Sequence, residues 1–431
     1  MNFKKTTLAN GLRIITVPMK DNPAVTVLVM AEVGSEYENK TTSGLSHYLE
    51  HMVFKGTTRR PRAIDISLEL DAIGAQYNAF TGQEYTGYYA KADSKHIRTC
   101  IDVVSDMYID PLFDPKEMEK EKGVIIEELK MYKDIPQHQV QELFSTTVYG
   151  DQPAGWSIGG TEATVASFTR ENLLKYRSEH YVPQSTIVAV AGSFGDSFTE
   201  ESLIAHIEKV FSVLPSNPKA PKSIVVEEQQ IPNVTIEYKE TDQTHMIMGV
   251  RSFSATDPRI PALRMLATIL GGGMSSRLFQ KLRDEMGVGY YVRVDNDVSH
   301  DHGVFSISTG VDTSRVEEVV AVLVAECKKF LVGAPELAIP AAELRKAKDY
   351  IIGGMMLSLE TSDSRAEFAV FQEIFKKTLR TPEAIAADVE AVTAAQIQDV
   401  ARDIFRDERL NFALIGRFKD TVPFKKLLTF R

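Results

Sequence analysis

The chain has 431 residues and is 43% hydrophobic, which is too long for one ordinary domain and predicts two domains of roughly 200 residues. Acidic residues outnumber basic residues by 59 to 49, and no run rich in Lys and Arg offsets the net charge of −10. This balance excludes nucleic acid as the expected partner. A dispersed solvated surface explains the acidity most simply, and attraction of basic peptides into a cavity is the alternative.

The start of the chain contains Lys4 and Lys5 but no apolar segment followed by a cleavage site, so a secretory signal is not expected. The longest apolar stretch, residues 24–31, is far shorter than the roughly 20 residues of a membrane span. Cys100 and Cys327 lie far apart and in no metal-binding or redox spacing, which favours a reducing compartment. These features predict a cytoplasmic protein without membrane association.

Regular elements can be predicted in chain order over the first third of the sequence. Val- and Ile-rich or alternating runs bounded by Pro, Asn or Gly predict strands over residues 12–17, 24–33, 76–81 and 84–91. Apolar residues at helical spacing predict a helix over residues 42–54, with Thr42 or Ser43 as its N-cap. Asp114 and Pro115 predict the start of a second helix that ends near Met131. The mixture predicts an α+β fold.

Residues 216–230 hold two prolines and little periodic apolar content, which predicts a linker between an N-terminal domain (1–215) and a C-terminal domain (231–431). Residues 169–194 and 393–418 match without a gap, since Gly416 lies 224 positions after Gly192. Each match is a helix that leads through an aromatic residue into a strand. We therefore expect two similar domains, each a mostly antiparallel sheet packed with helices, related by internal duplication. The alternative is a chance likeness between two helix–strand units.

The predicted helix over residues 42–54 carries His47, Glu50 and His51. Histidines four residues apart lie on one helix face, so both imidazoles can reach one ion, and Glu50 lies beside them. Zinc lowers the pKa of bound water toward about 7, and an adjacent carboxylate can take the proton of that water. The pattern predicts a hydrolytic zinc site with Glu50 as general base. In the alternative, the two histidines have a structural role only.

A catalytic zinc also needs a third protein ligand and an open position. The predicted helix from Pro115 is crowded with acidic residues, most of which are expected to form a solvated face. Glu121 and Glu128 are seven residues apart and therefore project from one face. Glu127 is the rival to Glu128 as a ligand, although it points about 100° away on the helix.

The inverted order H-x-x-E-H, with a glutamate 77 residues after His51, resembles the pitrilysin or insulinase family of zinc peptidases. This family includes insulin-degrading enzyme and the mitochondrial processing peptidase. The resemblance extends over essentially the whole chain. The length of the chain matches the short-chain branch of the family. It implies one Zn²⁺ per chain, Glu128 as the third ligand, and Glu121 as a residue that supports the ligands.

The resemblance also implies substrate-binding residues. The predicted strand with Asn78, Ala79 and Phe80 is similar to the family strand that pairs with the substrate backbone, although an ordinary edge strand is the alternative. Arg283 and Tyr290 coincide with the family's arginine and tyrosine, which can bind a substrate carbonyl and the developing oxyanion; Tyr291 is the fallback. The glycines at 271–273 lack a following Lys–Ser/Thr pair and are predicted to form a tight turn.

The activity implied by the resemblance is that of a metalloendopeptidase that hydrolyses unfolded peptides. Family members twice this length close two halves around a chamber, so this shorter chain is expected to form a homodimer, with a heterodimer as the alternative. The competing class is a non-catalytic subunit that keeps the fold and binds peptides or partners in a hetero-oligomer.

Overall fold

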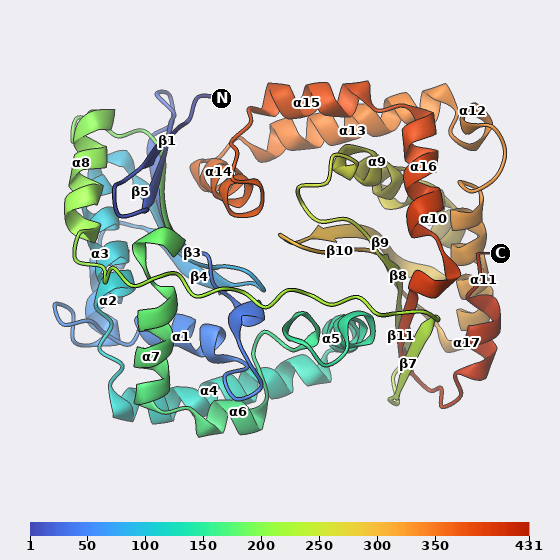
Figure 1. Ribbon diagram of the computed structural model, residues 1–431, viewed down its shortest axis with the longest axis horizontal. Helices are drawn as coiled ribbons and strands as arrows, with labels where there is room; N and C mark the ends of the chain where they lie inside the picture. The colour runs from blue at the N-terminus through green and yellow to red at the C-terminus, as the bar shows by residue number, and fades with distance from the viewer. Residues whose placement is uncertain (431) are drawn as a thin grey trace. The chain divides into compact units, whose positions relative to one another are not determined.

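The computed structural model describes residues 1–430, with the exception of the Tyr290 side chain (Figure 1). The chain forms two compact units, and each unit takes one segment from the other half of the sequence. Unit 1 comprises Met1–Lys130, Trp156–Ser223 and Ser358–Thr381, and unit 2 comprises Met131–Gly155, Ile224–Leu357 and Pro382–Arg431. The predicted linker, residues 216–230, includes the junction after Ser223. The predicted boundaries, 1–215 and 231–431, stay a prediction; a contiguous division of this kind differs from the two units by the segments Met131–Gly155 and Ser358–Thr381.

Unit 1 is built on a six-stranded sheet with the order β1-β2-β6-β3-β5-β4. Its strands are β1 (Lys4–Thr7), β2 (Arg13–Pro18), β3 (Ala24–Ala31), β4 (Gln76–Thr81), β5 (Thr86–Asp93) and β6 (Thr186–Gly192). β2 runs parallel to β6, and the other neighbouring pairs are antiparallel. β4 ends the sheet, and within the described residues it pairs with β5 only.

Both faces of this sheet are covered, so a central strand such as β3 is mostly apolar and is buried from Val25 to Ala31. On one face, Val25, Val27 and Val29 pack into the main core of the unit. The helices of unit 1 on the chain before Ser223 are α1 (Leu45–Val53), α2 (Ala63–Asp71), α3 (Ile97–Ile109), most of α4 (Pro115–Asp134), α6 (Glu162–Ser167), α7 (Arg170–His180) and α8 (Glu200–Phe211). On the other face, Leu28 and Met30 contact α14 (Ser362–Lys376), which comes from late in the chain (Figure 1).

Unit 2 contains a five-stranded sheet with the order β7-β11-β8-β10-β9. Its strands are β7 (Asn233–Tyr238), β8 (Gln243–Arg251), β9 (Gly289–Val298), β10 (Gly303–Asp312) and β11 (Leu410–Gly416). One face packs into a core with helices α9 (Ile260–Gly271), α10 (Arg277–Phe279), α11 (Val316–Lys328), α12 (Pro335–Ala338), α13 (Ala341–Ser358), α15 (Pro382–Ala391), α16 (Ala394–Ile404) and α17 (Val422–Leu427). On the other face, Val140, Phe144 and Val148 of the early helix α5 (Pro136–Tyr149) pack against the sheet.

Apart from the additional edge strand β1 in unit 1, the two sheets have the same topology. The parallel pair β2–β6 corresponds to β7–β11, and β3, β5 and β4 follow in the same antiparallel order as β8, β10 and β9. The repeat found in the sequence is reproduced residue by residue, because α16 and β11 begin 224 positions after α7 and β6. The predicted α+β fold with two similar, duplicated domains is therefore confirmed. The predicted strands and helices also match β2, β3, β4, β5, α1 and α4 within a few residues.

Candidate metal centre

Helix α1 separates its apolar and polar residues onto two faces. Leu45, Leu49 and Met52 are buried in the core of unit 1, and this anchors the helix through its apolar face. His47 and His51 lie on the other side with ring centroids 4.7 Å apart and an angle of 70° between the ring planes. The two imidazoles therefore stand next to each other, as the four-residue spacing predicts.

The N-terminus of α1 is held by a residue outside the helix. The N-cap is Gly44, which has φ of +93°, so the prediction of Thr42 or Ser43 as N-cap is wrong. Glu38 is buried, and its two carboxylate oxygens accept hydrogen bonds from the backbone N–H groups of Gly44 and Ser46, each at 2.7 Å. Burial raises the pKa of the Glu38 carboxyl to about 8, although the hydrogen bonds from Ser46 and Gly44 act in the opposite direction. Glu38 thus takes the role that a serine or threonine side chain was expected to fill.

Replacing Glu38 by Ala leaves two buried backbone donors without an acceptor. Because such unsatisfied groups are costly, we expect the free energy of unfolding to fall by about 1–3 kcal/mol per donor lost. Glu38→Gln keeps one acceptor oxygen and should lose about half as much. Urea denaturation of the three proteins measures the difference; equal stability of native protein and Glu38→Ala would contradict this account of the helix start.

The third candidate ligand comes from helix α4. The Oε2 atom of Glu128 lies 3.4 Å from His51 Nε2 and 3.9 Å from His47 Nε2. One ligand atom from each of the three residues lies within 4.8 Å of the other two. Tetrahedral zinc with bonds of about 2.1 Å needs ligand atoms about 3.4 Å apart. Two imidazole nitrogens and one carboxylate oxygen in this arrangement therefore fit a zinc ion with small adjustments.

Glu127 takes a different direction from the same helix. Its side chain is 73% exposed and forms an ion pair with Lys130 at 2.8 Å. The carboxylate of Glu127 is therefore engaged at the surface, and it does not belong to the group of possible ligands formed by His47, His51 and Glu128. The structure thus brings Glu128, rather than its neighbour, to the two histidines.

Glu121 and Lys55 orient His51. Glu121 Oε1 lies 2.9 Å from His51 Nδ1, and Glu121 Oε2 lies 2.6 Å from Lys55 Nζ. Burial alone would raise the pKa of Glu121, but the hydrogen bonds from His51 and Lys55 outweigh it, and the pKa is lowered. The ionised carboxylate accepts the Nδ1 proton and leaves the Nε2 lone pair for a metal. Lys55 was not identified from the sequence, where a lone lysine after a helix carries no signal.

His47 is suited to metal binding by its charge state. Burial, and secondarily the neighbouring His51, lower its pKa to about 4. The imidazole is therefore neutral near pH 7, and the neutral ring is the form that coordinates a metal.

Glu50 lies between the histidines in sequence and contacts β4. Its Oε2 accepts a short hydrogen bond from Thr81 Oγ1. Burial raises the pKa of Glu50, although the bond from Thr81 acts in the opposite direction. A carboxyl group with a raised pKa is a stronger base in its ionised form, which is the property that proton abstraction from water requires.

Comparisons with known proteins agree with these features. Residues 13–162 match the family described as Insulinase (Peptidase family M16), and residues 167–350 match the Peptidase M16 inactive domain. An uncharacterized zinc protease of Bacillus subtilis is 34% identical over 94% of this chain and 96% of its own length. The chain belongs to peptidase family M16. A second M16 relative, an uncharacterized zinc protease of Streptomyces coelicolor, is 34% identical over 97% of this chain and 90% of its own length.

Solved structures show that the M16 fold is kept at much lower identity. The crystal structure of a protease from Helicobacter pylori has a TM-score of 0.87 at 22% identity and covers 96% of this chain and 99% of that chain. A peptidase M16 inactive domain from Pseudomonas fluorescens has a TM-score of 0.87 at 16% identity and covers 97% of this chain and 99% of that chain. The residues His47, Glu50, His51 and Glu128 all fall in the first family match.

The predicted substrate strand of this M16 chain is the edge strand β4. Asn78 is exposed, Ala79 is buried, and Phe80 is half-buried against Tyr85 with ring centroids 6.0 Å apart. Asn78 Oδ1 accepts from the backbone N–H of Ala79 at 2.9 Å. An edge strand that ends at the contact with Glu50 is a suitable place for an extended peptide to pair.

The structure places the predicted arginine and tyrosine in unit 2. Arg283 is exposed on the helical turn Gln280–Glu285 and lines a cavity of about 870 Å³ with Gly287, Gly289 and Arg315. The side chain of Tyr290 lies outside the described residues, so its predicted role remains a prediction. The fallback residue Tyr291 has its hydroxyl 3.2 Å from His245 Nδ1.

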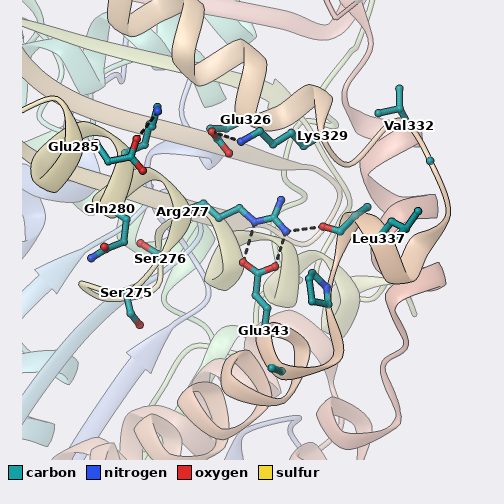
Figure 2. A pocket seen from close by; sticks show the side chains of 15 residues that line it. Ser275, Ser276, Arg277, Gln280, Glu285, Glu326, Lys329, Val332, Leu337 and Glu343 are labelled. Atoms are coloured by element: carbon teal, nitrogen blue, oxygen red, sulfur yellow. Dashed lines mark hydrogen bonds and ion pairs between the residues drawn. The ribbon is translucent and has the colours of Figure 1, made fainter.

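The glycine-rich segment of unit 2 forms the predicted tight turn. Gly273 has φ of +88°, and its carbonyl accepts from Ser276 N at 3.1 Å and Ser276 Oγ at 2.7 Å. The next residues line a cavity of about 880 Å³ (Figure 2). Within it, Arg277 donates to both carboxylate oxygens of Glu343 and to the carbonyl of Ala338. The charges of Arg277 and Glu343 therefore neutralise each other within the protein. This pairing favours a structural role for the two side chains over binding of a charged ligand in the cavity.

In the described residues, no helix combines the length and the apolar character that crossing a membrane requires.

Proposed function

We propose that this M16 chain is a zinc-dependent endopeptidase that hydrolyses unfolded peptides. One Zn²⁺ per chain would be held by His47, His51 and Glu128. The proposal rests mainly on one observation, the convergence of these three side chains next to Glu50, with ligand atoms within 4.8 Å of one another. The names of the relatives as zinc proteases support the same metal, and imidazole and carboxylate ligands suit zinc.

Zinc, when bound, would polarise a substrate carbonyl and lower the pKa of coordinated water toward about 7. Glu50 would take a proton from the attacking water and pass it to the nitrogen of the leaving amine. Since Glu50 Oε2 accepts from Thr81, Oε1 is the oxygen free for this transfer. During the reaction, Glu121 would continue to accept the hydrogen bond from the Nδ1 proton of His51.

Substrate binding is proposed to use β4. A peptide added to this edge at Asn78, Ala79 and Phe80 would be held through its main chain, so selectivity for side chains would be loose. Arg283 is proposed to bind a substrate carbonyl, and Tyr290 to donate to the developing oxyanion.

We further propose a cytoplasmic location and a homodimer that encloses the peptide; a heterodimer is the alternative assembly.

Purified protein should cleave peptides of graded length, lose this activity with a chelator, and regain it when zinc is restored. Metal analysis and light scattering on the same sample give the zinc content and the size.

Mixing Glu50→Gln with Tyr290→Phe chains would restore activity if Tyr290 acts on the partner's site. A dimer that holds zinc but cleaves no peptide would instead support the alternative, a non-catalytic M16 subunit that binds peptides or partners.

A further inference from the structure

The hydrogen bond between Thr81 and Glu50 joins two elements with different proposed tasks. Thr81 is the last residue of β4, and Glu50 lies on α1, 31 positions earlier in the chain. Among the described residues, Thr81 provides the one hydrogen bond recorded to the Glu50 carboxylate. The orientation of the proposed base therefore depends on a side chain that is not itself one of the candidate metal ligands.

The surroundings of Thr81 make it a rigid donor. A β-branched side chain has few rotamers at χ1, and the backbone of Thr81 is held in register opposite Thr86 of β5. Its neighbours on β4 are also packed, with Ala79 buried and Phe80 in contact with the face of the sheet that α14 covers. The hydroxyl can thus hold Glu50 Oε2 in one place.

A carboxylate held by one oxygen cannot rotate freely, so the other oxygen has a defined direction. Resting on the function proposed above, we propose that Thr81 is a positioning residue that orients Glu50 Oε1 toward the attacking water. The same strand would receive the peptide, so β4 would align both the substrate and the base. Nearby charges act on Glu50 differently, because His51 and Glu128 influence it electrostatically without a hydrogen bond.

The test compares Thr81→Val, which removes the hydroxyl and keeps the branched shape, with Thr81→Ser, which keeps the hydroxyl. We expect kcat of Thr81→Val to fall by up to about 100-fold, the size of effect that a small misplacement of a catalytic group produces. KM, zinc content and thermal stability should stay close to native values. Thr81→Ser should keep kcat within about threefold of native, because it retains the donor.

A double-mutant cycle separates positioning from a structural effect. In the Glu50→Gln background, Thr81→Val should cause no further loss of residual kcat, since it acts through Glu50 alone. Equal kcat in Thr81→Val and native enzyme, or additive losses in the cycle, would overturn the proposal. If Thr81→Val is unstable, Thr81→Ala replaces it in the same cycle. Inactivity of the native enzyme would instead count against the proposed function, and this proposal would fall with it.

Discussion

Glu50→Gln is expected to remove most of the peptide hydrolysis and to leave the metal centre assembled. Loss of a general base typically lowers kcat by about 10²–10⁴-fold. The amide has nearly the shape of the carboxylate, and its oxygen can still accept from Thr81 Oγ1, so the packing between α1 and β4 should persist. Peptide hydrolysis at saturating substrate, measured beside zinc content, gives the result.

The controls for this variant separate chemistry from folding. Glu50→Gln should unfold at the same temperature as the native protein and bind peptides with similar affinity. Glu50→Asp keeps a carboxylate but withdraws it from its native position, so we expect intermediate activity. Native activity in Glu50→Gln would exclude this residue as the base and require another proton acceptor in the site.

Glu128→Ala is expected to lose zinc, whereas Glu127→Ala should keep it. Removing Glu128 leaves only His47 and His51 in the cluster, and Glu127 pairs with Lys130 at the surface. Because loss of a residue behind the ligands already weakens metal binding by about 10–100-fold, loss of a ligand should weaken it more. Competition with a chelator of known affinity measures zinc binding in the three proteins.

Thermal unfolding with and without added zinc gives an independent readout. A ligand at 100 times its Kd stabilises the folded state by about 2.7 kcal/mol. The native protein and Glu127→Ala should show this stabilisation, and Glu128→Ala should show little of it. Equal zinc binding by both variants would mean that the metal site has been assigned to the wrong carboxylate.

Local patterns in the sequence predicted much of the fold. The strands β2 and β3 follow from runs of Val and Ile, and α1 follows from apolar residues at helical spacing. The duplication was visible because a helix and the strand after it recur at one fixed offset. Each of these features depends on residues close together in the chain, where backbone geometry limits the outcomes.

The exchange of α5 and α14 between the two halves of the chain could not be predicted in the same way. An amphipathic helix shows that it must bury one face, but not which sheet will cover it. Both sheets also have two apolar faces, which leaves more than one place for such a helix. The helix start at Gly44 was missed for a related reason, since its cap is the side chain of Glu38 in the preceding loop.

The sequence by itself determined that His47, Glu50 and His51 share one side of a helix, because helical periodicity depends on spacing alone. It left the choice between Glu127 and Glu128 to a family resemblance, and it did not show Lys55 or Thr81 as part of the site. Tertiary structure decided these points by bringing α4 and β4 to α1. The physical reason is that contacts between residues tens of positions apart depend on how the elements pack, and not on the pattern within any one of them.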